Sequence, residues 1–342
     1  MNNEVKNYRT SKVLIACVVA CLITVQYSVV VPIISFQSES STSSSSSSLE
    51  HKTKIVAVSN DGYKEIALIW YEDMIKLGYR NLAVATVDEE SHFFLSEKNV
   101  EVDKILPDDQ WPLPIIPNRL QMNRRQIFGT RWIYIHSYLK KGYNVLLTDV
   151  DNKFVRYMPM EDLESSKYDI YHAHCGGFPR RFKSMGFTVC GGMTWIRASP
   201  PGIQYVEKIL EHCEGWNFTN TPIRCDDQVV VNNLIFTKIL NYTFDGEIKD
   251  PTNYTNFFWK PTLEGTSELT GHKFKIWDVH TAYRGPVNGV DGVCPKNNWV
   301  AMPTNTIIEE NATRPQNDTA DRVLRFQQWK DYCQEEETKI DY

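Results

Sequence analysis

Residues 144–156 read NVLLTDVDNKFVR, a short apolar run that ends in two carboxylates, Asp149 and Asp151, one residue apart. The preceding residues 119–141 carry apolar side chains at helical spacing and end at Gly142. A helix that leads directly into a buried strand is typical of the βαβ units of parallel sheets. Asp149 is therefore expected at the carboxyl end of a parallel strand, where open α/β sheets bind their ligands.

The same alternation extends along the chain in both directions. Two β-branched runs, KIVAVSN (54–60) and NLAVATVD (81–88), flank a helical stretch that Gly78 is placed to end. Further strands are predicted at YDIYHAH (168–174), CGGMTWIRAS (190–199) and FKIWDVH (274–280). Helices are predicted to begin at Pro200 and after Asp226, the expected N-cap. The sequence thus predicts an α/β fold with a Rossmann-like, mostly parallel sheet flanked by helices.

The N-terminal segment carries the signature of a membrane anchor. Residues 13–36 contain no charged side chain and are long enough to cross about 30 Å of hydrocarbon. The cationic residues Lys6, Arg9 and Lys12 precede them. By the positive-inside rule we expect a cytosolic tail at 1–12 and a transmembrane signal-anchor at 13–36. A cleaved signal peptide is the alternative, although its apolar core would be about half as long.

The segments after the anchor have the composition of a lumenal protein. Residues 37–52 are Ser-rich and predict a flexible stem, followed by a domain at 53–290 and a loop-rich extension at 291–342. N-glycosylation sequons occur at Asn217, Asn241, Asn253, Asn311 and Asn317. Beyond the anchor the cysteines are Cys175, Cys190, Cys213, Cys225, Cys294 and Cys333. An even number suggests disulfides of undetermined pairing, so we expect a single-pass type II protein of the Golgi membrane.

The two carboxylates of the DVD stretch leave three interpretations open: a divalent-metal site, a nucleophile pair or a polar turn. Hard oxygen ligands suit Mg²⁺ or Mn²⁺, which typically also bind substrate phosphates. Aspartyl phosphatases of the haloacid dehalogenase type share the pattern, but Lys153 occupies the place of their Thr or Val. An EF-hand is excluded because Phe154 stands where its loop requires glycine. The net charge of −5 gives no reason to expect nucleic acid as a partner.

Several segments together resemble one family. VSNDGY, ATVDEES, KGYNVLLTDVDNKFVR, CGGMTWIRASP, DDQVVVNN and VHTAYRGP occur in the order found in the nucleotide-diphospho-sugar transferase family of GT-A glycosyltransferases. That family includes plant cell-wall xylosyl- and arabinosyltransferases. The resemblance covers roughly residues 52 to 290. It implies a GT-A fold and transfer of a sugar from a UDP-sugar to a glycan or glycoprotein acceptor, with retention and with Mn²⁺ (or Mg²⁺) as cofactor.

The resemblance also assigns roles to individual residues. Asp151 is expected to hold the metal, Asp149 to contact the metal or the ribose, and His280 to complete the coordination sphere. Asp227 is expected to contact the donor sugar or to stabilise positive charge at its anomeric carbon. In an inverting enzyme Asp227 would instead be the base that deprotonates the acceptor.

The remaining expected donor-binding residues each have a plain structural alternative. Arg131 would reach the diphosphate, or lie on a solvated helix face. Gly191 and Gly192 would let the backbone approach the donor sugar, or simply fit a tight strand entry. Polar residues at strand ends, which are expected to contact uridine and ribose, are Ser59, Asn60 and Asp88. The alternative is that polar residues also end strands without a functional role. A different class also remains open, a catalytically inactive lumenal module of the same fold that binds glycans.

Overall fold

The structure is a computed structural model. It describes residues 52–104, 124–154, 156–175, 179, 181–182, 187–214, 223–237, 239–245, 263–277, 282–285 and 300–303. The predicted anchor at 13–36, the stem up to residue 51 and His280 lie outside the described residues. No helix within the described ranges is long and apolar enough to cross a membrane.

Among the described residues, nine strands form the main sheet in the order β3-β2-β1-β4-β7-β6-β10-β9-β8. They are β1 Thr53–Ser59, β2 Leu82–Thr86, β3 Val102–Lys104, β4 Asn144–Asp149, β6 Ile170–His174, β7 Val189–Ile196, β8 Tyr242–Asp245, β9 Glu264–Ser267 and β10 Lys273–Ile276. β1 pairs in parallel with both β2 and β4, and β2 pairs in parallel with β3. The chain thus builds outward from β1 in two directions, and the switch lies between β1 and β4.

The prediction of a mostly parallel sheet is wrong for half of it. β7 runs antiparallel to both β4 and β6, and β9 runs antiparallel to β8 and β10. β6 and β7 follow one another in the chain and are neighbours in the sheet, so their connection needs no crossover helix. The apolar runs that predicted these strands carry no information about strand direction. The sheet is therefore mixed.

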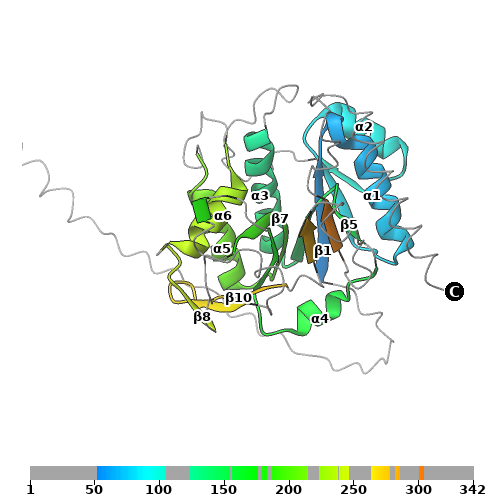
Figure 1. Cartoon of the computed structure of the whole chain (residues 1–342). Coiled ribbons are helices and arrows are strands. Elements are labelled where there is room, and N and C mark those ends of the chain that lie inside the picture. Colours follow the sequence, from blue (N-terminus) through cyan, green and yellow to red (C-terminus); the bar gives the residue numbers. More distant parts are fainter. Residues whose placement is uncertain are drawn as a thin grey trace, which may run out of the picture. The chain divides into compact units, whose positions relative to one another are not determined.

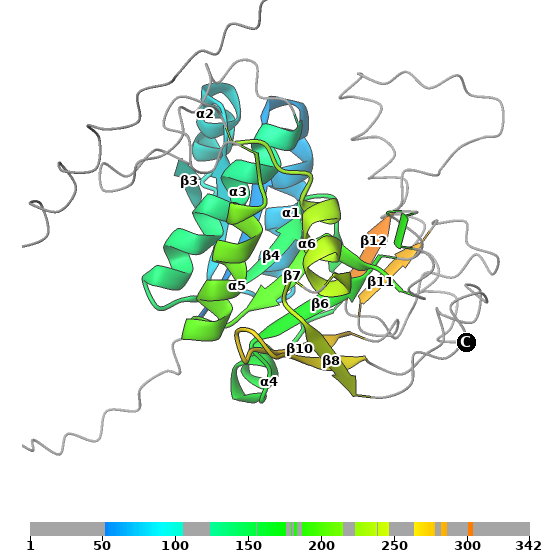
Figure 2. The ribbon, with the colours of Figure 1, turned by 90° about the vertical axis from the view of Figure 1, so that its left-hand side faces the viewer.

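Helices cover both faces of this sheet. They are α1 Lys64–Lys76, α2 Glu89–Glu97, α3 Arg124–Lys140, α4 Met160–Ser165, α5 Pro200–Glu211 and α6 Asp227–Phe236, with a short 3-10 helix η1 at Asp61–Tyr63. α1 and α2 lie on one face, and α3, α5 and α6 lie side by side on the other (Figures 1 and 2). The α/β class and the flanking helices predicted from the sequence are confirmed.

The helix boundaries follow from local chemistry. Gly78 and Gly142, just beyond α1 and α3, have φ values of +98° and +88°. Glycine adopts this left-handed backbone without the steric cost that a Cβ atom would add. The side chain of Ser199 caps α5 by accepting a hydrogen bond from the amide of Gly202 at 3.2 Å. The C-terminal ends of α1 and α3 and the N-terminal end of α5 are thus the helix boundaries with the clearest signals in the sequence.

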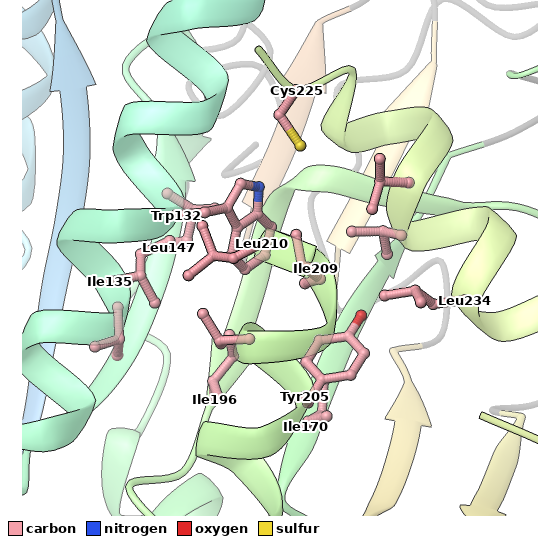
Figure 3. Packing of buried hydrophobic residues seen from close by; sticks show 14 of the residues in the cluster. Trp132, Ile135, Leu147, Ile170, Ile196, Tyr205, Ile209, Leu210, Cys225 and Leu234 are labelled. Atoms are coloured by element: carbon pink, nitrogen blue, oxygen red, sulfur yellow. The ribbon is translucent and has the colours of Figure 1, made fainter. Parts of the chain in front are cut away.

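Alternate residues of β1, β2 and β4 enter two separate hydrophobic clusters. In β4, Leu146 packs in the cluster under α1, whereas Val145 and Leu147 pack in the cluster under α3, α5 and α6. Figure 3 shows the second cluster, in which Trp132 of α3 and Leu210 of α5 lie near Leu147. Because side chains alternate along a strand, residue 149 has the same orientation as residue 147. The carboxylate that ends β4 is thereby directed toward α3.

A second, three-stranded sheet adjoins the DVD stretch. Its strands are β5 Lys153–Phe154, β11 Ala282–Gly285 and β12 Val300–Pro303, in the order β11-β12-β5. β12 pairs antiparallel with β5, two residues after Asp151. A strand from the segment expected to be a loop-rich extension therefore belongs to the same structural unit as the DVD stretch.

Within the described ranges, one disulfide joins Cys213 at the end of α5 to Cys225 just before α6. Two of the six cysteines beyond the predicted anchor are therefore paired. Cys175 and Cys190 are buried thiols, and Cys294 and Cys333 lie outside the described residues. Of the five sequons, Asn241 falls within the described ranges, and it is exposed at the start of β8.

Removing this disulfide is expected to destabilise the protein measurably. The bridge closes a loop of 12 residues, for which the chain-entropy treatment gives about 3 kcal/mol. Urea unfolding of the Cys213→Ala/Cys225→Ala variant should show that loss in the free energy of unfolding. Adding a thiol reductant should lower the stability of the wild type toward that of the variant and leave the variant unchanged. Equal stability of the two proteins under oxidising conditions would contradict the bridge.

Buried histidines should make the fold sensitive to mild acid. Burial lowers the pKa of His172 to about 3 and that of His272 to about 4. Both bind neutral partners, His172 to Thr194 and Tyr205, and His272 to Thr270 and Tyr242. The unfolded chain takes up these protons near pH 6.5, so stability is complete above that pH and falls as the pH drops toward 4.

For each of these histidines, the free energy of unfolding falls by up to about 1.4 kcal/mol per pH unit as the pH drops from 6.5 toward 4. Urea unfolding between pH 7 and pH 5 measures the slope, in a range above the titration of most carboxylates. The His272→Gln variant should show a shallower slope than the wild type. An identical slope in both proteins would refute this assignment.

Candidate active site

The candidate site lies at the carboxyl ends of β1, β2 and β4, beside the switch between β1 and β4. Val58 of β1 is the pairing partner of Asp149, the last residue of β4. Open α/β sheets bind ligands in the crevice at such a switch point because the connections diverge there. The predicted position of Asp149 is confirmed.

Arg131 of α3 is the central residue of the site. Its Nη1 donates to Oδ1 of Asp149 at 2.7 Å, and its Nη2 donates to the carbonyl oxygen of Gly191 at 2.9 Å. The same Nη2 also pairs with Oδ2 of Asp227. The side chain of Arg131 is 5% exposed, against 36% for that of Asp149. Arg131 thus does not lie on a solvated helix face, and its guanidinium contacts carboxylates of the protein.

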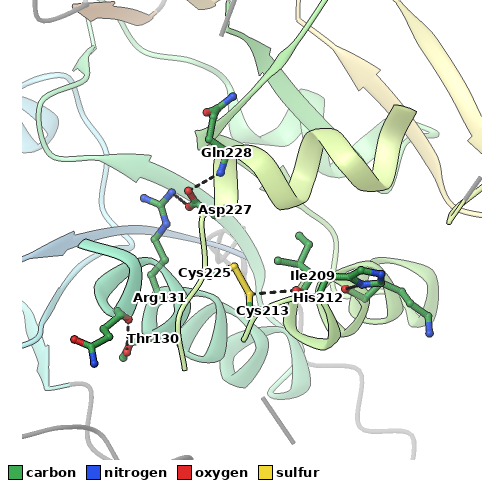
Figure 4. Close-up of a disulfide and its surroundings, with 10 residues drawn as sticks. Thr130, Arg131, Ile209, His212, Cys213, Cys225, Asp227 and Gln228 are labelled. Carbon is green, nitrogen blue, oxygen red and sulfur yellow. Dashed lines mark hydrogen bonds and ion pairs between the residues drawn. A yellow bond between two sulfur atoms is a disulfide. The ribbon is translucent and has the colours of Figure 1, made fainter. Parts of the chain in front are cut away.

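Asp227 is the first residue of α6, and its side chain is only 2% exposed. Figure 4 shows the guanidinium of Arg131 directed at this carboxylate, whose other oxygen accepts from the amide of Gln228 at 2.7 Å. Burial raises the pKa of Asp227, and the charge of Arg131 opposes this shift. Burial alone would lower the pKa of Arg131, but the charges of Asp227 and Asp149 raise it. The guanidinium therefore stays charged between two carboxylates.

Gly191 and Gly192 give these carboxylates their space. A Cβ atom on Gly192 would lie 1.9 Å from Oδ2 of Asp149, and one on Gly191 would lie 3.3 Å from Cγ of Asp227. Any side chain at position 192 would displace the Asp149 carboxylate. The sequence assigned the two glycines to donor binding or to a strand entry. In the structure, Gly192 leaves space for the Asp149 carboxylate, and Gly191 allows β7 to pack closely against α6.

The segment before α6 is fixed to α3. The amide of Cys225 donates to the carbonyl oxygen of Arg125 at 2.8 Å, and the disulfide to Cys213 ties the same residue to α5 (Figure 4). A Cβ atom on Gly129 would approach Ile223 to 2.9 Å, so only glycine permits this packing. Sequence reasoning missed Gly129. A glycine inside a helix costs about 1 kcal/mol relative to alanine, which is the signal that marks such a contact.

Most of the polar side chains at the ends of β1 and β2 already form hydrogen bonds with other groups of the protein. Both oxygens of Asp88 accept backbone hydrogen bonds, from Ser91 at 2.7 Å and from Asp61 at 2.8 Å. Asp88 is the N-cap of α2, a helix that the sequence analysis did not predict. Ser59 is buried and donates to the carbonyl oxygen of Asn60 at 3.3 Å. Asn60 is half-buried and is the accessible polar side chain at the end of β1.

Two further predicted roles can be compared with the geometry. Asp226 occupies the N-cap position of α6 as expected, but its side chain makes no capping hydrogen bond. β6 confirms the strand predicted at YDIYHAH (168–174), and its residues His172 and His174 are both buried.

Asp149 and Asp151 are the two carboxylates of the site that could hold a divalent cation. Oδ1 of Asp149 binds Arg131, whereas its Oδ2 occupies the space that a side chain at Gly192 would fill. Asp151 is half-buried in the turn that follows β4. No group of three or more His, Cys, Asp or Glu residues suited to a metal exists in the described part of the chain, and His280 lies outside it. Two carboxylates still fit Mg²⁺ or Mn²⁺, which often bind through one or two carboxylates and the phosphates of a substrate.

Comparison with known proteins decides the family. A family model described as nucleotide-diphospho-sugar transferase matches residues 78–312, which include Arg131, both DVD carboxylates, the Gly191–Gly192 pair and Asp227. The chain belongs to the nucleotide-diphospho-sugar transferase family. The match covers more than half of the chain and all of the site residues held by Arg131.

Individual relatives of this transferase are distant. Beta-arabinofuranosyltransferase RAY1 of Arabidopsis thaliana is 24% identical over 190 residues, which cover 51% of this chain and 32% of RAY1. The chain spans about a third of the length of that curated relative. Solved structures that match the chain include an active-site mutant of LgtC, at 12% identity and a TM-score of 0.37, covering 80% of this chain and 94% of LgtC. Apo GlyE of Streptococcus pneumoniae TIGR4 has 11% identity and a TM-score of 0.41, covering 84% of this chain and 64% of GlyE.

Proposed function

We propose that this transferase moves a glycosyl group from a UDP-sugar to a glycan or glycoprotein acceptor, with retention and with dependence on Mn²⁺ or Mg²⁺. The observation that carries the proposal is the arrangement around Arg131. Arg131 contacts both the DVD carboxylate Asp149 and the α6 carboxylate Asp227, at the switch point of the sheet. The chain that carries this arrangement belongs to the nucleotide-diphospho-sugar transferase family. A sugar diphosphate presents a phosphate group and an anomeric carbon, which require a cation and a carboxylate respectively.

Asp149 and Asp151 are the residues that would hold the cation, with His280 as the proposed third ligand. Bound there, Mn²⁺ or Mg²⁺ would supply Lewis-acid neutralisation of the departing diphosphate. Asn60 is half-buried at the end of β1, and we propose that its side chain contacts the nucleoside.

Asp227 is proposed to stabilise positive charge that develops on the donor sugar. It is almost fully buried, and both of its oxygens accept hydrogen bonds from protein groups, Arg131 and Gln228. This arrangement favours an electrostatic role over removal of a proton from the acceptor, the role that Asp227 would have in an inverting enzyme. Retention is proposed on this basis together with the resemblance.

The donor panel that tests the proposal begins with pentoses, because the relative RAY1 is named as an arabinofuranosyltransferase. The purified full-length chain is incubated with UDP-arabinofuranose, UDP-xylose, UDP-galactose and UDP-glucose, with Mn²⁺ or with EDTA. We expect UDP release from one donor above the others and none in EDTA. Release that is equally fast in EDTA would refute metal dependence. A protein that binds glycans but releases no UDP from any donor would be the inactive module instead.

The compartment is also proposed. The uncharged run at 13–36, its cationic flank and the sequons support a single-pass type II protein of the Golgi membrane with the transferase domain in the lumen. Asn241 is exposed, as an oligosaccharide acceptor must be.

A further inference from the structure

Asn152 follows the DVD stretch directly and is 4% exposed, which is unusual for a polar residue in a turn. A buried amide must find hydrogen-bond partners, or it costs about 1–3 kcal/mol. The partners of Asn152 therefore identify what it holds in place.

Three hydrogen bonds of Asn152 close the turn around Asp149 and Asp151. Its backbone amide donates to the carbonyl oxygen of Asp149 at 3.1 Å. Its side-chain Nδ2 donates to Oγ1 of Thr148 at 2.9 Å and to the carbonyl oxygen of Gly192 at 3.2 Å. One residue thus ties the far end of the turn to its start on β4 and to the neighbouring strand β7.

Side chains at both ends of the turn are fixed as well. Lys153 forms an ion pair at 2.5 Å with Asp73 of α1 and continues into β5. Asp149 is held by Arg131 at 2.7 Å. Asp151 therefore lies on a short turn that is anchored at both ends, so that binding a cation does not require the turn to become ordered first.

We propose that Asn152 is a positioning residue that presets the DVD turn, so that Asp149 and Asp151 present their carboxylates to one divalent cation. This inference rests on the metal-dependent transferase function proposed above. An amide is required because Nδ2 donates to two acceptors at once, which an aspartate at this position could not do. Groups that orient metal ligands typically change metal affinity by about 10–100-fold when they are removed.

The test compares Asn152→Ala with Asn144→Ala in the full-length chain. Asn144 is a matched control because it is also a buried asparagine of the β4 segment that bonds across to the β7 side, accepting from Ala198 at 2.9 Å, at the opposite end of the strand. Calorimetric titration with Mn²⁺ in the presence of UDP gives the dissociation constant. We expect Asn152→Ala to weaken Mn²⁺ binding at least tenfold and Asn144→Ala to leave it unchanged.

Kinetics provide a second readout. In Asn152→Ala the Mn²⁺ concentration for half-maximal activity should rise at least tenfold, while kcat at saturating Mn²⁺ stays near that of the wild type. Should Asn152→Ala fail to fold, Thr148→Val keeps the Asn152 side chain but removes Oγ1, which accepts from Asn152 and donates to the carbonyl oxygen of Asp149 at 3.1 Å. This variant should weaken Mn²⁺ binding by a smaller factor. Unchanged Mn²⁺ affinity in the folded variants, or equal weakening by Asn144→Ala, would overturn the inference but leave the proposed function intact. A wild-type chain that binds no Mn²⁺ would overturn both.

Discussion

The Asp151→Asn variant is expected to lose at least about a hundredfold in transferase activity, measured as UDP release at a fixed Mn²⁺ concentration. Asparagine keeps the size of the side chain but removes the negative charge that a divalent cation requires. Stabilisation of a leaving diphosphate by a bound cation is worth several kcal/mol, and a hundredfold loss corresponds to about 2.7 kcal/mol. The variant should fold normally because Asp151 lies in a turn and is half-buried.

Asp162→Asn is the matched control for this change. Asp162 is an exposed aspartate in the first turn of α4, and its substitution should leave the rate of UDP release unchanged. Wild-type rates in Asp151→Asn at every Mn²⁺ concentration would show that the DVD turn does not serve the reaction. Equal losses in both variants would indicate a general effect of charge.

Replacing Arg131 by methionine should cost about 3–5 kcal/mol in the free energy of unfolding, the range found when one partner of a buried ion pair is removed. The guanidinium pairs with Asp149 and with Asp227, and the latter is only 2% exposed. Without Arg131, the charge that chiefly opposes the effect of burial on the pKa of Asp227 is lost, and the hydrogen bond from the backbone amide of Gln228 remains. The ionised carboxylate then destabilises the fold at neutral pH. Protonation at low pH removes this penalty, and the gap between variant and wild type should narrow as the pH falls.

Urea unfolding at pH 7 and pH 5 measures both effects. Arg125→Met is the control, because Arg125 lies exposed in the first turn of the same helix. A second variant, Arg131→Met/Asp227→Leu, should recover stability without recovering activity, since apolar replacement of a buried pair is often neutral. A stability loss below about 1 kcal/mol in Arg131→Met, the level of a surface ion pair, would contradict the buried network.

The parts of the fold that follow from local chemistry could be predicted from the sequence. The helical spacing between residues 119 and 141 and the glycine at 142 were sufficient to place Asp149 at the end of a strand. Strand direction was not predictable, because β7 has an apolar run suited to either orientation. α2 was not predicted because its residues EESHFFLSE are mostly polar. Its N-cap, Asp88, was instead predicted to contact the uridine or ribose of the donor.

The site was predicted as a set of residue types rather than as a geometry. Asp149, Asp227, Arg131 and the Gly191–Gly192 pair were all singled out, but as separate contacts to a donor. Their mutual contacts depend on tertiary packing between α3, β4, β7 and α6, which sequence spacing does not encode. Asn152 was missed because an asparagine after two aspartates has the composition of an ordinary polar turn. Only its burial and its bonds to Thr148 and Gly192 distinguish it.

The central claim is that the DVD turn at the end of β4 binds the diphosphate of a nucleotide through a divalent cation. Calorimetric titration of UDP into the full-length chain, with Mn²⁺ and then with EDTA, tests this most directly. The account predicts saturable binding of UDP with Mn²⁺ that weakens at least tenfold in EDTA. UDP binding of equal affinity in both conditions, or no binding in either, would contradict it.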